Sequence, residues 1–131
     1  MMSKVIFACG LIGAGKTTWA KKKGRRVTDM DDLPDGSRKK DQIKQTKRLL
    51  KKGDVFHITC YPTREELRAF KAVEKDFVLI DASKRQAKTN ILIRGRDRDL
   101  ENIGSVFQAN KEYWRRFKTS DLPFRKAKVM P

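Results

Sequence analysis

Hydrophobic residues in this chain are grouped in short runs, and charged segments separate the runs. Residues 4–9 form a nearly continuous apolar run, which is typical of a strand covered on both faces. Further apolar runs lie at residues 54–59 and 76–81, and a shorter one at residues 25–28 leads into an acidic stretch. We therefore expect four strands over these ranges and a fifth, at a sheet edge, over residues 122–129.

Helix signals lie between the expected strands. Gly24 and Gly53 stand where a helix would end, because glycine commonly follows the last helical turn. Thr63 and Ser105 each precede a Glu or Gln by three residues, which is the spacing of a capping box at a helix N-terminus. The five expected helices cover residues 16–23, 38–52, 64–74, 84–98 and 105–117.

Strands and helices alternate along the chain, so the sequence predicts an α/β fold with a mostly parallel sheet of four or five strands and helices on both faces. The length of 131 residues suits one domain over residues 1–131. No apolar run reaches the roughly 18 residues that a membrane span needs, so we expect no membrane-spanning segment. Cys9 and Cys60 lack metal-binding spacing, so we expect reduced thiols in a cytoplasmic protein.

A glycine-rich motif follows the first expected strand. Residues 10–17 fit the pattern GxxxxGK[ST] and stand between a strand and a helix, as a phosphate-binding P-loop requires. In such a loop backbone amides surround a phosphate at the helix N-terminus, Lys16 reaches the β- and γ-phosphates, and the Thr17 hydroxyl binds Mg²⁺. A glycine turn that only connected the strand to the helix would need neither Lys16 nor Thr17. We therefore predict a P-loop NTPase fold that binds ATP and Mg²⁺ through Gly10, Leu11, Ile12, Gly13, Ala14, Gly15, Lys16, Thr17 and Thr18.

The rest of the chain narrows the class of nucleotide-using protein. GTPases carry an Asn-Lys-x-Asp motif for guanine, and the nearest string here, residues 110–113, lacks the acid. Motor ATPases and helicases are usually longer than 131 residues. A small phosphotransferase is the class that remains.

Four stretches resemble the 5′-kinase domain of the phage polynucleotide kinases and, more broadly, the small P-loop kinases that include gluconate kinases and zeta toxins. They are residues 13–20, 29–32, 58–65 and 92–98. The resemblance implies that Asp31 is the general base and that Arg94 and Arg98 belong to a lid over about residues 84–100. Two positions depart from the pattern: Pro34 replaces an acceptor-binding arginine, and His57 or Thr59 stands where the family places an acid.

The residues themselves agree with these roles but leave alternatives. Asp31 follows a strand, so it faces the crevice where ligands bind in parallel sheets, although it and its neighbours can also cap a turn, and Asp32 is a second candidate base. Arg94 and Arg98 stand four residues apart, so one helix would present both to the γ-phosphate, unless they form a solvated basic face. Asp81, or an acid within residues 29–32, is a candidate second magnesium ligand.

The charge of the chain points to the acceptor. Lys and Arg number 32 against 16 Asp and Glu, which gives a net charge of +16. Most of the excess lies in residues 36–52, 84–98 and 111–128. A nucleic acid suits such a surface better than a small substrate does, and we expect DNA rather than RNA. We expect a kinase that phosphorylates a 5′-hydroxyl end or a modified base; the alternatives are a nucleoside monophosphate or other small-molecule kinase and a non-catalytic, ATP-gated DNA-binding module.

Overall fold

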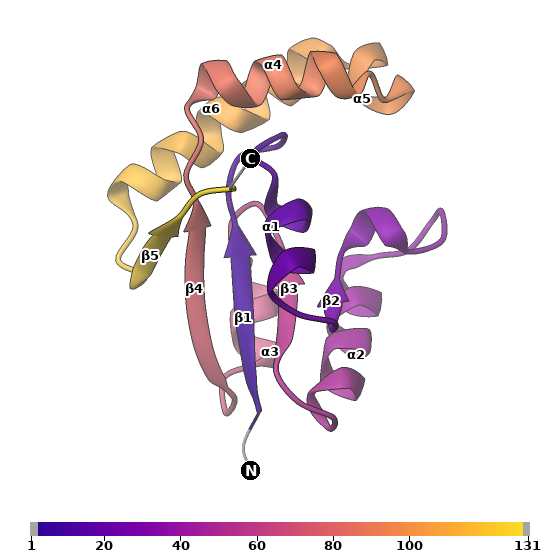
Figure 1. Ribbon diagram of the computed structural model, residues 1–131, viewed down its shortest axis with the longest axis vertical. Coiled ribbons are helices and arrows are strands. Elements are labelled where there is room, and N and C mark those ends of the chain that lie inside the picture. Colours follow the sequence, from indigo (N-terminus) through magenta and orange to yellow (C-terminus); the bar gives the residue numbers. More distant parts are fainter. Residues whose placement is uncertain (1–2, 130–131) are drawn as a thin grey trace.

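Five parallel strands form one sheet in the order β2-β3-β1-β4-β5 in the computed structural model, which describes residues 3–129 (Figure 1). β1 is central and pairs in parallel with β3 on one side and β4 on the other. The predicted α/β fold is thus confirmed, and all five expected strands are present. Their bounds are Lys4–Cys9 (β1), Val27–Thr28 (β2), Val55–Ile58 (β3), Glu74–Ile80 (β4) and Phe124–Ala127 (β5).

The helices cover both faces of the sheet and the carboxyl ends of its strands. In Figure 1, α1 lies on one face, α2 and α3 lie on the other, and α4, α5 and α6 cross above the strand ends. Their bounds are Lys16–Lys23 (α1), Lys39–Leu50 (α2), Arg64–Ala69 (α3), Lys84–Arg94 (α4), Asp97–Glu101 (α5) and Ile103–Thr119 (α6), and a 3₁₀ helix, η1, spans Met30–Asp32.

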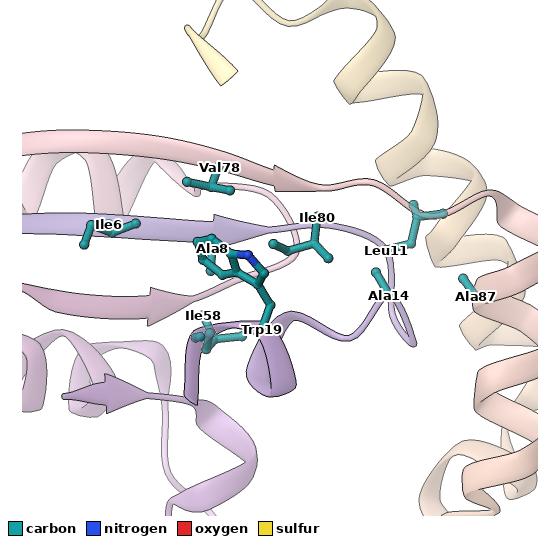
Figure 2. Close-up of a cluster of buried hydrophobic side chains, with 10 residues drawn as sticks. Ile6, Ala8, Leu11, Ala14, Trp19, Ile58, Val78, Ile80 and Ala87 are labelled. Carbon is teal, nitrogen blue, oxygen red and sulfur yellow. The ribbon is translucent and has the colours of Figure 1, made fainter. Parts of the chain in front are cut away.

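The central strand divides the core into two clusters, because successive side chains of a strand point to opposite faces. Ile6 and Ala8 pack with Trp19 of α1, as Figure 2 shows. Val5, Phe7 and Cys9 pack on the other face with residues that include Ile43 of α2 and Phe70. Every residue of β1 after Lys4 is buried, which confirms the interpretation of residues 4–9 as a strand covered on both faces.

Three expected helix boundaries are wrong. The helix predicted over residues 84–98 breaks at Gly95, which has a left-handed φ of 61° and caps α4. The helix predicted over residues 64–74 ends at Ala69, and β4 begins five residues later. α6 begins two residues before Ser105, so the predicted capping box lies inside the helix. The first of these breaks has a local cause, because a left-handed glycine is a common helix C-cap.

Neither cysteine is paired, in agreement with the expectation of free thiols. Cys9 is buried at the end of the central strand, and burial raises the pKa of its thiol well above the usual value, so it is protonated and unreactive. Cys60 is half-buried and lines the cleft described below. Within residues 3–129 no helix has both the length and the apolar character needed to cross a bilayer.

Candidate active site

The loop between β1 and α1 has a backbone that only glycine accommodates at two positions. Gly13 and Gly15 adopt left-handed φ angles of 87° and 93°. A Cβ atom on Gly13 would lie 2.5 Å from the carbonyl oxygen of Ala87, far inside van der Waals contact. α4 therefore packs directly against the backbone of the loop.

The first turn of α1 faces an open cleft. The helix begins after Gly15 without a side-chain cap, so the amides of its first turn are available to a ligand at the positive end of the helix dipole. Three lysines occupy its last turn, where cations stabilise the opposite end of the dipole. This arrangement is the one that binds phosphate groups at helix N-termini.

The Lys16 ammonium group lies at the mouth of the loop. It donates hydrogen bonds to the carbonyl oxygens of Gly10, at 3.1 Å, and of Leu11, at 2.8 Å. The Sγ atom of Cys60 lies 3.5 Å from the same nitrogen. The strand end of β3 and the loop after β1 thus hold one cation at the cleft.

The cleft has a volume of about 540 Å³ and is lined by segments that lie far apart in the sequence. Six of the nine predicted loop residues line it: Ile12, Gly13, Gly15, Lys16, Thr17 and Thr18. Gly10, Leu11 and Ala14 do not. They are buried beneath the loop, and Leu11 and Ala14 belong to the hydrophobic cluster of Figure 2, so their side chains anchor the loop and do not face a ligand.

Two asparagines that the sequence analysis did not select fix the loop from above. Asn110 of α6 accepts a hydrogen bond from the Ile12 amide at 2.7 Å and donates one to the Ile12 carbonyl at 3.0 Å. Asn90 of α4 donates to the Gly13 carbonyl at 2.8 Å. The Ile12 amide is therefore already paired and does not belong to the phosphate-binding set. Asn110 is buried in the middle of an amphipathic helix, and that unusual position is the only sequence signal that pointed to it.

Thr17 and Asp29 place a hydroxyl and a carboxylate side by side next to the loop. The Thr17 hydroxyl donates a short hydrogen bond to the carboxylate of Asp29, which is buried at the end of β2. Within the described chain no group of three or more His, Cys, Asp or Glu side chains can hold a metal alone. One hydroxyl and one carboxylate fit Mg²⁺ that arrives with nucleotide phosphates, because Mg²⁺ typically takes few protein ligands.

Asp81 does not face the phosphate loop's cleft. It lines a separate, mostly apolar hollow of about 250 Å³ with Trp114 and Phe117 of α6. Of the two alternatives for a second magnesium ligand, the geometry therefore favours an acid within residues 29–32, and specifically Asp29.

Asp31 lies in the cleft and is held by two arginines of the α4–α5 segment. Arg96 contacts one carboxylate oxygen at 2.8 Å and Arg98 contacts the other at 3.0 Å. Partial burial favours a higher pKa for Asp31, but the hydrogen bonds from Arg98 and Arg96 outweigh it and lower the pKa. The neighbouring candidate, Asp32, is exposed and pairs with Lys21 at 3.8 Å.

The two arginines of the expected lid line the cleft, but they do not lie on one helix as predicted. Arg94 and Arg98 do not share a helix face, because Gly95 ends α4 between them. Both nevertheless line the cleft, and Arg96, which the sequence analysis did not select, lies between them. Arg94 is oriented by the buried Asp99 at 2.8 Å. The α4–α5 segment thus presents three guanidinium groups to the cleft.

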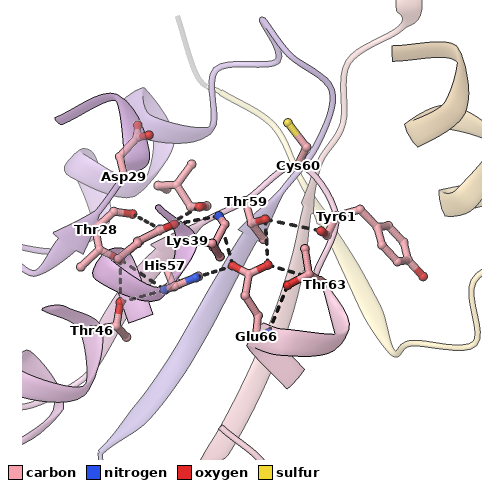
Figure 3. Close-up of polar contacts among 12 residues, drawn as sticks. Thr28, Asp29, Lys39, Thr46, His57, Thr59, Cys60, Tyr61, Thr63 and Glu66 are labelled. Carbon is pink, nitrogen blue, oxygen red and sulfur yellow. Dashed lines mark hydrogen bonds and ion pairs between the residues drawn. The ribbon is translucent and has the colours of Figure 1, made fainter. Parts of the chain in front are cut away.

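A buried polar network supports the opposite wall of the cleft (Figure 3). His57 and Glu66 are fully buried, and their Nε2 and Oε2 atoms lie 2.5 Å apart. The Lys39 ammonium group reaches the same carboxylate at 3.3 Å and lines the cleft. Burial favours a higher pKa for Glu66, but the hydrogen bond from His57 and the charge of Lys39 lower it to about 2. His57 is therefore a packed residue of β3. Its partner Glu66 holds the Lys39 ammonium group at the cleft.

Charge in the cleft is mainly positive. Six cationic side chains line it, whereas only three carboxylates do. The cations are Lys16, Lys39, Arg94, Arg96, Arg98 and Arg116, and the carboxylates are Asp29, Asp31 and Asp99. A polyphosphate is the kind of ligand that such a lining attracts.

Comparison with solved structures identifies the fold. A gluconokinase from Sinorhizobium meliloti 1021 superimposes with a TM-score of 0.58 and 14% identity over 98% of this chain and 83% of that one. The deoxyadenosine kinase of M. mycoides, solved with bound dATP, gives a TM-score of 0.51 and 15% identity over 95% of this chain and 90% of that one. By sequence, no protein-family model and no curated protein matches. The chain has the fold of small P-loop kinases.

Proposed function

We propose that the chain is an ATP-dependent phosphotransferase that moves the γ-phosphoryl group to a hydroxyl on nucleic acid, either a 5′-hydroxyl end or a modified base. One observation carries the proposal. The phosphate-binding loop with Lys16 and the carboxylate of Asp31 line the same cleft, and two arginines, Arg96 and Arg98, pair with that carboxylate. A nucleotide-binding module without catalysis would need the loop but no carboxylate facing it.

The loop residues account for binding of the triphosphate. The amides at the start of α1 and the Lys16 ammonium group offer hydrogen-bond donors to the β- and γ-phosphates. Thr17 and Asp29 would hold the magnesium ion, which when bound offsets negative charge on the phosphates. These contacts position the donor, and positioning is a large part of catalysis in phosphoryl transfer.

Asp31 supplies the proton chemistry, and the lid arginines bind the transferring group. A γ-phosphoryl group offers Arg96 and Arg98 a second anion to bind, so its arrival releases Asp31 from its two partners. Asp31 then accepts the proton of the acceptor hydroxyl while that oxygen bonds to the γ-phosphorus and the bond from the γ-phosphorus to the bridging oxygen of ADP breaks. The arginines stabilise the charge on the transferring group.

Two observations bear on the acceptor. The net charge of +16 and the exposed cations of α2 favour a polyanionic acceptor. The cleft volume of about 540 Å³ is within the range for small-ligand sites, which favours a nucleoside monophosphate or another small molecule as the alternative. Both readings use the same donor site and the same base.

The experiment is transfer of labelled γ-phosphate from ATP to three acceptors: a 5′-hydroxyl oligonucleotide, a hydroxymethylated duplex and a set of mononucleotides. We expect label on one of the first two. Label on mononucleotides alone would contradict the nucleic-acid assignment. Asp31→Ala should abolish transfer and preserve ATP binding, whereas a variant that still transfers normally would contradict the role of Asp31.

A further inference from the structure

The exposed face of α2 carries a row of lysines. Lys40, Lys44 and Lys47 stand four and three residues apart, so they share one face of the helix, and Lys51 continues the row just past its end. All four are exposed, whereas Gln42, Ile43 and Thr46 are the buried residues of the helix and face the core. We call these four residues the α2 lysine stripe.

The stripe has no acidic partner in the part of the chain that the structure describes. None of the ion pairs within residues 3–129 includes any of its four lysines. Lysines three or four residues apart on a helix repel one another. Lys40 also lies in the first turn, where the helix dipole disfavours a cation. The stripe therefore costs helix stability in the free protein, and a polyanion would remove that cost.

The stripe begins next to a residue that lines the cleft. Lys39, the residue before it, is half-buried and lines the cleft with Asp31. The buried Glu66 carboxylate and the Gln42 side chain hold the Lys39 ammonium group, at 3.3 Å and 2.8 Å. A chain of phosphates that ran along the stripe could thus reach a fixed cation in the same cleft as the candidate base.

We propose that the α2 lysine stripe binds the phosphate backbone of a single-stranded nucleic acid whose reactive hydroxyl enters the cleft. The stripe is one side chain wide, and four residues advance about 6 Å along a helix, so it follows one phosphate backbone better than it covers a flat anionic surface. The inference rests on the proposed function, because it assigns the remote part of the same acceptor.

The test compares two triple variants of equal net charge. Lys40→Gln/Lys44→Gln/Lys47→Gln removes three members of the stripe. Lys71→Gln/Lys111→Gln/Lys128→Gln removes three exposed lysines that lie outside the cleft. Affinity for a short single-stranded 5′-hydroxyl oligodeoxynucleotide is measured by fluorescence anisotropy over a range of salt concentrations, and melting is followed by circular dichroism.

We expect the stripe variant to lower the slope of log K against log salt by about 2 relative to the wild type, since each phosphate contact on a single strand contributes about 0.7. At about 0.1 M salt this corresponds to an affinity loss on the order of a hundredfold. The control variant should keep the wild-type slope, and the stripe variant should melt no lower than the wild type.

Equal losses in the two triple variants would overturn the proposal, because net charge alone would then explain binding. Tighter wild-type binding to anionic vesicles than to the oligonucleotide would overturn it as well. If the wild type transfers no phosphoryl group but oligonucleotide binding still depends on the stripe, the proposed function is wrong and the stripe proposal is supported. If the wild type phosphorylates one of the acceptors but binds the oligonucleotide independently of the stripe, the stripe proposal is wrong and phosphoryl transfer is supported.

Discussion

Glu66 offers a quantitative test of the network behind the cleft. Its carboxylate has no exposed surface and accepts hydrogen bonds from the Thr59 hydroxyl, at 3.2 Å, and the Thr63 amide, at 2.9 Å, besides its contacts with His57 and Lys39. These partners stabilise the ionised form, and they lower the pKa of Glu66 from 4.5 to about 2. One pKa unit corresponds to about 1.4 kcal/mol, so the shift contributes about 3 kcal/mol to the free energy of unfolding near neutral pH.

The sign of the pH dependence follows from the direction of the shift. The folded pKa lies below the unfolded value, so the contribution is complete above pH 4.5 and is lost as the pH falls toward 2. We expect Glu66→Gln to lower the free energy of unfolding by about 3 kcal/mol at about pH 7 and by only about 1 kcal/mol at about pH 3.

Urea unfolding of the wild type and the variant at several pH values measures this difference directly. The matched control is Glu65→Gln, on the same helix but exposed, which should change stability by less than about 0.5 kcal/mol at every pH. If Glu66→Gln lowered the free energy of unfolding by the same amount at neutral and acid pH, the reasoning would be refuted. The loss would then come from altered packing and not from the charge of the carboxylate.

Further predictions concern the loop and the lid. Gly13→Ala should lower the free energy of unfolding by about 1–3 kcal/mol in chemical denaturation, since its Cβ would meet the Ala87 carbonyl, whereas Gly104→Ala, with nothing within 4 Å, should not destabilise the protein. Asn110→Ala should cost about 1–3 kcal/mol and weaken ATP binding in calorimetry, because both polar groups of Ile12 lose their partner; unchanged binding would contradict its role. Asp31→Asn should retain or strengthen ATP binding and lose most phosphoryl transfer, and normal turnover would contradict a base at this position.

The sequence predicted the phosphate-binding loop well because the loop is formed by residues that are close together in the sequence. β1 and α1 have the predicted bounds, residues 4–9 and 16–23, and the motif between them fixes the loop by its own glycines. A contiguous pattern of strand, loop and helix needs no distant contact to be recognised.

The other half depends on contacts between residues far apart in the sequence. Arg96 reaches Asp31 across 65 positions, and Asn110 reaches Ile12 across 98. The helical spacing of Arg94 and Arg98 predicted a shared face, but the left-handed Gly95 redirects the chain between them. The link from Lys39 to Glu66 joins α2 to α3 across 27 positions, and no local pattern records that contact.

The central claim is that the loop after β1 binds a triphosphate. Isothermal titration calorimetry of the protein with ATP and magnesium tests it most directly. The claim predicts a one-site binding isotherm that Lys16→Ala weakens severely. Absence of binding heat with ATP at about millimolar concentration, the weak end of the usual affinity range, would contradict it.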